Sequence, residues 1–467
     1  MNIFPFLFFI FKVIISSEPL TFSFTTRKKK GDNFMETLIN NDIYTSFLVG
    51  SNKQLIEFNI KSQQSSTFLL SESCSQNTKA KKFIENESSS YTVKLAKARY
   101  YMYEFKEATY SSDNIILLQN NNKQIEVDNY NFMLANTLWD DYQEYMGGMI
   151  GLKFQNKVEG KLTEPERTYF IEQLKEKNKI NSYVFVLDYK DEYNGIFYVG
   201  EYFHDFNKNY SSNDFISAKA GNEKFKFKDW DLNIEKVISG NTIEQNNTYL
   251  QLFYELGIIA APESYRAYIN NTFFKSYYKD GICKEMLNLE KIASFKKYNY
   301  IVCDKNKFKK ESFPKLIFYN RDMNLNLTMD YNNLFVENEN KIYFLIIFPI
   351  YGIDVEYWLM GKPFIKKYKL FLDNDKKSIG LYLNYKEIKK EEEEEEKNNN
   401  KNSNVYIVII IILVVVLIAS LISIFYYFLV IKKARRIRAN ELDDNIDYTP
   451  YNNDKEKEKE NKFIINY

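Results

Sequence analysis

Residues 44–74 read YTSFLVGSNKQLIEFNIKSQQSSTFLLSESC, and this stretch decides the fold. β-Branched and aromatic residues dominate three short runs in and beside it, Ile43–Val49, Leu55–Ile60 and Thr67–Leu70. Gly, Ser, Asn and Gln separate these runs. Apolar runs of this length between turn residues predict β-strands. The stretch therefore predicts a strand hairpin that leads through a turn into a third strand.

The same pattern continues along most of the chain. Further strand-like runs are Ser182–Leu187, Gly195–Val199 and Ile342–Phe348. Helical periodicity is confined to Glu164–Glu176, whose first turn is acidic, and to Glu263–Ile269, which follows a proline. We therefore predict a mainly β fold. The roughly 370 residues between the terminal segments correspond to two lobes or domains, at ~100–200 residues per domain.

Residues 44–74 resemble the first lobe of the pepsin-like aspartic proteases. In that family a tyrosine-led hairpin leads to Asp-Thr-Gly-Ser-Ser, then an aromatic residue and a cysteine. Further residues similar to family landmarks follow in order: Gly148, Ile150, Gly151, Leu152, Gly195, Gly200, Trp230, Trp358, Gly361, Phe364, Ile365, Tyr368, Asp373 and Gly380. The resemblance implies a bilobal pepsin-like fold, with β lobes at 18–200 and 201–385. It also implies an interlobe cleft that takes an extended peptide or protein ligand.

The resemblance also indicates where the catalytic acids should lie. Aspartic proteolysis needs two carboxyl groups that share one proton. Matching back from Cys74 places Lys61 at the first aspartate, and matching back from Pro262 places Phe253 at the second. Neither residue can replace a carboxylate. A charged lysine accepts no hydrogen bond, and a phenyl ring has no ionisable proton to donate. We therefore expect a peptide-binding pseudoprotease in which no catalytic residue is confirmed.

Two alternatives stay open. Glu255-Leu256-Gly257 mimics Asp-Thr-Gly, so in another register Glu255 would be a surrogate acid of an active aspartic endopeptidase. The chain could also be a surface adhesion or receptor module of unrelated fold. In the pepsin-like case we predict an ion pair between Lys61 and Glu255, because a buried ammonium needs a partner. Tyr110 is the candidate for the tyrosine of the flap.

Cysteine and histidine are too scarce for most other site chemistries. The chain has 3 Cys and 1 His, so a zinc centre or a Ser-His or Cys-His nucleophile is not expected. Phosphate-binding glycine motifs are absent from the sequence and the net charge is +1, so we predict no metal, no cofactor and no nucleic-acid partner. In an oxidising compartment Cys283 and Cys303 could form a disulfide, in the region of a disulfide of the resembled family. The partner of Cys74 stays open.

Five N-x-S/T triplets are candidates for N-glycosylation. They begin at Asn86, Asn209, Asn246, Asn270 and Asn326.

Apolar segments at the two ends of the chain predict its topology. Residues 1–17 are apolar and end in small residues, which predicts a signal peptide. Val405–Ile431 has no charge and would form a helix of roughly 40 Å, enough to span a bilayer core of ~30 Å. The charged and Asn-rich residues 386–404 predict a solvated stalk. The basic residues after Ile431 predict that the tail, 432–467, is cytosolic.

Together these segments predict a single-pass type I membrane glycoprotein. Its two lobes would lie in the lumen of the secretory or endolysosomal pathway or at the cell surface. The order of signal peptide, lobes, stalk, span and short tail resembles the architecture of β-secretase.

Overall fold

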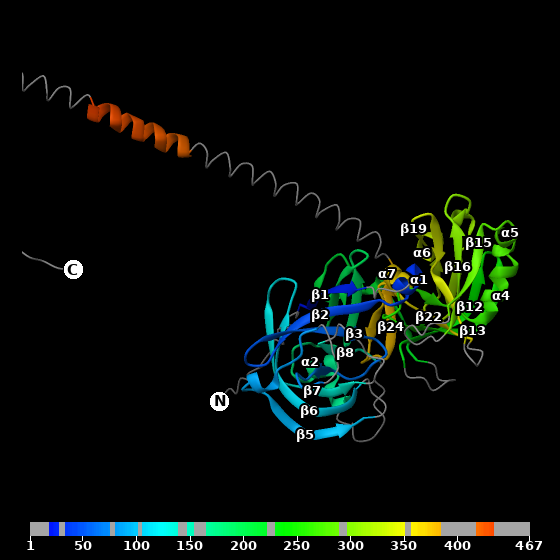
Figure 1. Cartoon of the computed structure of the whole chain (residues 1–467), viewed down its shortest axis with the longest axis horizontal. Coiled ribbons are helices and arrows are strands. Elements are labelled where there is room, and N and C mark those ends of the chain that lie inside the picture. Colours follow the sequence, from blue (N-terminus) through cyan, green and yellow to red (C-terminus); the bar gives the residue numbers. More distant parts are fainter. Residues whose placement is uncertain are drawn as a thin grey trace, which may run out of the picture. The chain divides into compact units, whose positions relative to one another are not determined.

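The computed structural model describes two separate parts of the chain. The described residues are 18–27, 33–74, 80–100, 105–138, 147–153, 165–221, 229–288, 297–350, 356–383 and 417–433. One compact unit comprises Met1–Tyr385, and a second comprises Lys386–Tyr467. The first unit contains two large sheets and short helices (Figure 1). The prediction of a mainly β fold is therefore confirmed, and the two sheets agree with a bilobal organisation.

The first sheet has 13 strands in the order β11-β24-β23-β9-β10-β1-β2-β3-β8-β4-β7-β6-β5. Their bounds are β1 Leu20–Arg27, β2 Asp42–Val49, β3 Gln54–Lys61, β4 Phe68–Leu70, β5 Thr92–Arg99, β6 Phe105–Leu118, β7 Gln124–Leu138, β8 Gly148–Gly151, β9 Val184–Tyr189, β10 Asn194–Val199, β11 Phe215–Lys219, β23 Phe371–Asp373 and β24 Ser378–Tyr382. Three strands from beyond residue 200 (β11, β23 and β24) also join this sheet, so the sheet itself is not confined to residues 18–200. The lobe boundary at residue 200 stays a prediction.

The second sheet has 11 strands. Ten follow the order β18-β17-β12-β13-β22-β14-β21-β16-β20-β19, and β15 pairs with β16 beside this path. Their bounds are β12 Asp231–Ser239, β13 Thr242–Leu252, β14 Ile259–Ala260, β15 Cys283–Asn288, β16 Tyr298–Asp304, β17 Leu316–Asn320, β18 Leu325–Met329, β19 Phe335–Asn338, β20 Lys341–Phe344, β21 Ile346–Pro349 and β22 Trp358–Met360.

The helices are short. Their bounds are α1 Phe34–Ile39, α2 Phe170–Glu176, α3 Phe203–Phe206, α4 Glu263–Asn271, α5 Phe274–Lys279, α6 Tyr331–Leu334, α7 Lys362–Tyr368, and the 3-10 turns η1 Glu85–Glu87, η2 Pro165–Thr168, η3 Ser212–Asp214 and η4 Lys310–Ser312. The single helix predicted over Glu164–Glu176 is in fact the turn η2 followed by α2. Tyr169 separates them: it is the N-cap residue of α2, its backbone is not helical, and its carbonyl accepts from Gln173 N at 3.1 Å.

Most predicted strands are confirmed, but Ile342–Phe348 is two strands rather than one. β20 pairs with β16, whereas β21 also pairs in parallel with β14. Leu345 lies between them, where its N–H donates to Leu334 O and its carbonyl accepts from Ile259 N. Both strands are largely buried, so the apolar residues run on without a break. The residue types therefore do not show where β20 ends and β21 begins.

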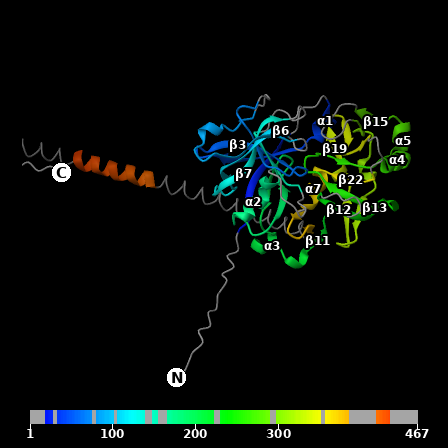
Figure 2. The ribbon, with the colours of Figure 1, turned by 90° about the horizontal axis from the view of Figure 1, so that it is seen from below.

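Helix α1 covers one face of the second sheet although it precedes the first hairpin in sequence. Met35 and Ile39 are fully buried and pack with Leu256, Ile258 and Leu359. In two perpendicular views α1, in blue, lies among the green and yellow elements of the second sheet (Figures 1 and 2). Asn33 caps this helix, since its side-chain oxygen accepts from Glu36 N at 3.1 Å. The chain therefore crosses to the second sheet before it returns to form β2.

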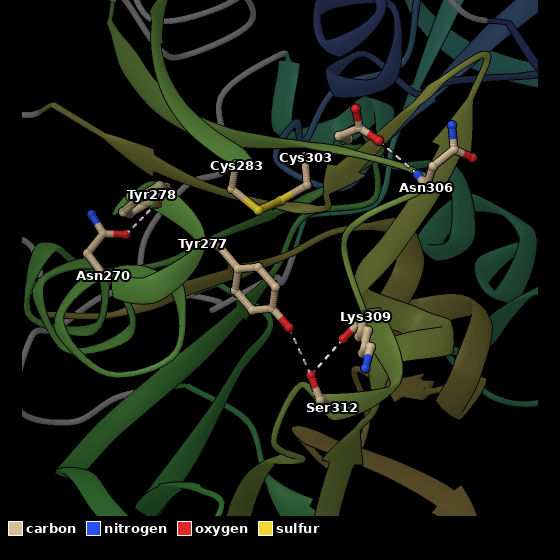
Figure 3. The surroundings of a disulfide bond; sticks show 9 residues. Asn270, Tyr277, Tyr278, Cys283, Cys303, Asn306, Lys309 and Ser312 are labelled. Atoms are coloured by element: carbon tan, nitrogen blue, oxygen red, sulfur yellow. Dashed lines mark hydrogen bonds between the residues drawn. A yellow bond between two sulfur atoms is a disulfide. The ribbon is translucent and has the colours of Figure 1, made fainter. Parts of the chain in front are cut away.

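The predicted disulfide joins Cys283 and Cys303 (Figure 3). The two cysteines are direct partners across the antiparallel strands β15 and β16, and both are buried. Helix α5 packs beside this hairpin, where the Tyr277 ring contacts Phe308 at 5.0 Å. The bond fixes β15, which pairs only with β16 within the described residues.

Replacing both Cys283 and Cys303 with alanine should lower the free energy of unfolding by about 3 kcal/mol, because the unfolded chain regains the freedom of the closed loop. Urea unfolding of the oxidised chain, followed by circular dichroism, measures the loss. A reductant should destabilise the wild type to the same degree and leave the double variant unchanged. Equal midpoints for wild type and variant would contradict this prediction.

The second unit is described only over 417–433, which is helical. This helix includes the last part of the predicted span Val405–Ile431, whose first twelve residues lie outside the described residues. Within the ranges that are described, no helix combines the length and apolar character needed to cross a membrane. The predicted signal peptide, the stalk and nearly all of the tail also lie outside the described residues.

Candidate functional site

Two turns of the same topology form the candidate site. β3 runs parallel to β8, and its last residue, Lys61, pairs with Gly151. β13 runs parallel to β22, where Leu252 pairs with Met360. Phe253 follows directly, and its N–H donates to Met360 O at 2.9 Å. Lys61 and Phe253 therefore take corresponding places, each where a strand of one sheet turns away beside a parallel partner.

The two turns are bonded to each other. Ser62 Oγ accepts from Tyr254 N at 3.2 Å and donates to Glu255 Oε2 at 2.6 Å. Gln63 N donates to Glu255 Oε1 at 3.3 Å, and Gln63 Nε2 donates to Leu252 O at 3.0 Å. Glu255 is only 8% exposed, so its carboxyl group depends on the Ser62 and Gln63 donors for the hydrogen bonds that water would otherwise provide. The structure therefore places Glu255 as a bridge between the turn after β3 and the turn after β13.

Lys61 has a counter-ion that the sequence interpretation missed. Its Nζ lies 2.7 Å from Asp42 Oδ1, and the two side chains are 18% and 11% exposed. Asp42 also accepts from Asn59 Nδ2 at 3.3 Å. Asp42 thus supplies the negative charge for which we predicted Glu255. Burial, and then the charge of Asp42, raises the pKa of the nearby Tyr44 phenol, which stays neutral.

Phe253 belongs to an apolar surface rather than to a polar one. It is partly buried and packs against the cluster that α1 forms with the second sheet. The next residue, Tyr254, is fully buried, and burial raises the pKa of its phenol. Residues 253 and 254 of this turn therefore contribute a phenyl ring and a neutral phenol, and Glu255 contributes the carboxyl group.

Gly257 explains why Glu255-Leu256-Gly257 imitates a catalytic motif. Its N–H donates to Ile39 O at 2.7 Å, and a Cβ here would lie 1.9 Å from Leu38 O. Only glycine allows the end of α1 to approach the turn so closely. The glycine of this triplet is therefore required for packing against α1, whether or not Glu255 acts chemically.

The contacts of the two acids decide what the arrangement can do. A shared proton requires two carboxyl groups in contact. Here Asp42 is bound to Lys61, and Glu255 is bound to Ser62 and Gln63. The site as described holds fixed hydrogen bonds and one ion pair. Across the described ranges, no three His, Cys, Asp or Glu side chains gather as a metal ion would require.

Tyr110, the candidate flap residue, lies inside β6 and is 6% exposed. It packs with Phe68, Phe105 and Met133. The turn of the β5–β6 hairpin lies elsewhere, since Tyr100 N donates to Lys106 O at 2.9 Å across its neck. Tyr110 therefore lies in a strand with its side chain buried, and its assignment to the flap stays a prediction.

The glycosylation candidates differ in exposure. The exposed ones are Asn86, Asn209, Asn246 and Asn326. Asn270 is partly buried, and its side-chain oxygen accepts from the Tyr278 hydroxyl at 2.9 Å (Figure 3). Its amide nitrogen donates to Glu285 Oε2 at 3.3 Å. Modification stays a prediction at all five sites, and Asn270 is the least accessible.

Comparison with known families identifies the fold that carries this site. The model of the family described as eukaryotic aspartyl protease matches residues 43–383. The match excludes the alternative of an unrelated β module. The family binds peptide substrates in the cleft that its fold provides. No curated protein matches the chain. The chain belongs to the eukaryotic aspartyl protease family.

Proposed function

We propose that this chain is a pepsin-like pseudoprotease that binds an extended peptide or protein segment in its cleft and does not cleave it. One observation carries the proposal: an ammonium, Lys61, ends β3, and a phenyl ring, Phe253, directly follows the corresponding end of β13. Hydrolysis by this family's chemistry requires a carboxyl group at each place. The ion pair between Lys61 and Asp42 supports the proposal, because it commits the acid that contacts Lys61 to a structural role.

The proposal includes anchoring in a membrane by a single span, Val405–Ile431. Its support is the uncharged apolar sequence and the basic residues that follow, which favour a cytosolic tail. The family domain would then face the lumen or the cell exterior, where the Cys283–Cys303 disulfide is stable. Washing membranes with alkaline carbonate tests this part. The full-length chain should stay in the membrane fraction, and its release would contradict anchoring.

A second candidate function is an active endopeptidase that uses Glu255. The observation that favours it is the position of this carboxylate, which reaches across to the opposite turn through Ser62 Oγ at 2.6 Å. This candidate needs a second acid, and Asp42 could serve only after it gave up Lys61. The pseudoprotease needs no such rearrangement, so the structure favours it over the active endopeptidase.

Incubation with denatured casein separates the two candidates. The full-length chain should produce no cleavage between about pH 3 and pH 6 that a statine-type inhibitor suppresses, because the shared proton is missing. Pepsin in a parallel reaction shows that the assay works. Inhibitor-sensitive cleavage that disappears in Glu255→Gln would overturn the pseudoprotease and support the second candidate. The folded state of that variant is checked by circular dichroism.

A further inference from the structure

Asp231 is a buried acid that the proposed function does not use. It is the first residue of β12 and is 0% exposed. Among the residues that the structure describes, neither of its carboxyl oxygens has a hydrogen-bond partner. It lies opposite Gln251 of β13 in the strand register. A buried carboxylate without donors from the described residues is unfavourable, so this environment favours the protonated acid.

A second acid lies beside it. Asp231 N donates to Asp229 O at 2.9 Å, a tight turn that keeps the two residues together. Asp229 is 8% exposed, and its Oδ1 lies 3.1 Å from Lys153 Nζ. Its Oδ2 accepts from Gln251 Nε2 at 3.0 Å. Asp229 therefore has a cation and an amide donor as partners, whereas the described residues offer the Asp231 carboxyl group neither.

The groups that face Asp231 come from several elements. Burial, and then the negative charge of Asp229, raises the pKa of Asp231 to about 8, while Lys153 lowers it. The Tyr249 and Tyr357 rings stack at 4.9 Å nearby. Burial, and then neighbouring groups that include both acids, raises the pKa of each phenol. The tyrosines thus stay neutral, and Asp231 is the group that titrates.

This pair of acids lies where the two sheets meet. Trp230, between the acids, donates from Nε1 to Leu152 O of the first sheet's side at 2.7 Å. Lys153 follows Leu152 in sequence. Gln251, which binds Asp229, also approaches Gln63 Oε1 at 3.4 Å. Asp229 is therefore connected through Lys153 to the segment that follows β8, and through Gln251 to the turn after Lys61.

We propose that Asp229 and Asp231 form a proton-operated latch between the two sheets. With the proton on Asp231 the pair carries one negative charge, which Lys153 neutralises, and the junction is closed. Loss of the proton to solvent puts two negative charges beside one lysine in a buried place. The junction then loosens at Trp230 and at the Leu152–Lys153 segment. The latch is independent of whether the cleft cleaves or only binds peptides.

The pH range of the effect follows from linkage. The folded chain holds this proton more tightly than the unfolded chain, in which an aspartic acid has a pKa of about 3.9. The contribution to stability is therefore complete below about pH 4, falls as the pH rises towards 8, and is constant above that value. The upper break in the stability profile reports the pKa of Asp231 in the folded state.

Urea unfolding of the full-length chain from about pH 4 to pH 9.5, followed by tryptophan fluorescence, tests the latch. Asp231→Asn should remove this decline and make the chain more stable than wild type at the alkaline end. Asp229→Asn should move the upper break to lower pH by about one unit, because a neighbouring negative charge is lost. Lys153→Gln should move it to higher pH by about one unit. Asp280→Asn, at an exposed helix end, is the control and should leave the profile unchanged.

Acrylamide quenching of the native chain gives a second readout. Quenching should increase at alkaline pH in wild type and not in Asp231→Asn. A profile of Asp231→Asn that superposes on wild type would overturn the latch. Shifts of the break in the same direction for Asp229→Asn and Lys153→Gln would also overturn it. These two variants decide the matter by themselves if Asp231→Asn does not fold, because a merely structural role predicts no opposite shifts.

Discussion

Replacing Asp42 with asparagine should lower the free energy of unfolding by about 3 kcal/mol. The variant leaves the Lys61 ammonium, which is 18% exposed, without the carboxylate that now lies 2.7 Å away. The cost is that of an ammonium held near the junction of two sheets with too little water. Urea unfolding at neutral pH measures it. The loss should persist in high salt, because a mostly buried pair is screened little.

A second substitution separates the charge from the packing. Asp42→Asn combined with Lys61→Met removes both charges and should recover most of the lost stability, since no isolated ion remains. The exposed pair Lys175–Asp375 is the control, with side chains 32% and 36% exposed. Lys175→Met should cost no more than about 1 kcal/mol. If the double variant is as unstable as Asp42→Asn alone, Asp42 does not serve as the counter-ion of Lys61.

This result would bear on function as well as on stability. An acid at the place of Lys61 would meet Asp42 as a like charge, so the surroundings of this position are arranged for a cation. The hairpin β2–β3 sets that arrangement, because Ile43 pairs with Ile60 and the next residues outward are Asp42 and Lys61. If Lys61 stands at the first catalytic position, as we propose, Asp42 is the partner that stabilises it there.

The sequence predicted most of the quoted strands because strand formation depends on local patterns. The hairpin at 44–60 has short apolar runs and a turn with Gly50 and Lys53 at positive φ. Landmarks such as Gly151 and Gly361 are found at the ends of β8 and β22, where a Cβ would lie 2.4 Å and 2.1 Å from backbone oxygens. Close approaches of this kind require glycine, so they leave a visible mark in the sequence.

The partner of Lys61 was missed for a different reason. Glu255 was chosen by analogy between two turns, and such a choice ignores neighbours across a strand pair. The register could have indicated Asp42, since Val49 pairs with Gln54 and counting outward along the hairpin reaches Asp42 opposite Lys61. Helix α1 gave no comparable signal. It has only 6 residues, and its place on the second sheet depends on long-range packing.

Trp230→Ala should lower the free energy of unfolding by about 3–5 kcal/mol. Trp230 is 1% exposed and precedes β12 of the second sheet, yet its ring meets Phe185 of the first sheet edge-to-face at 5.7 Å. Truncation would open a cavity where the sheets meet and leave Leu152 O without its indole donor. Urea unfolding followed by circular dichroism measures the loss.

Comparison with Trp230→Phe divides this loss into two parts. Phenylalanine keeps most of the apolar contact but cannot donate to Leu152 O, so the remaining cost should be about 1–3 kcal/mol. Ile243→Ala is the control, because its side chain is 52% exposed on β13 and its truncation should cost about 0.5 kcal/mol or less. If Trp230→Ala behaves like Ile243→Ala, the indole does not hold the two sheets together. A large loss for alanine with a small one for phenylalanine would show that ring packing, more than the hydrogen bond, joins the sheet that contains Lys61 to the sheet that contains Phe253.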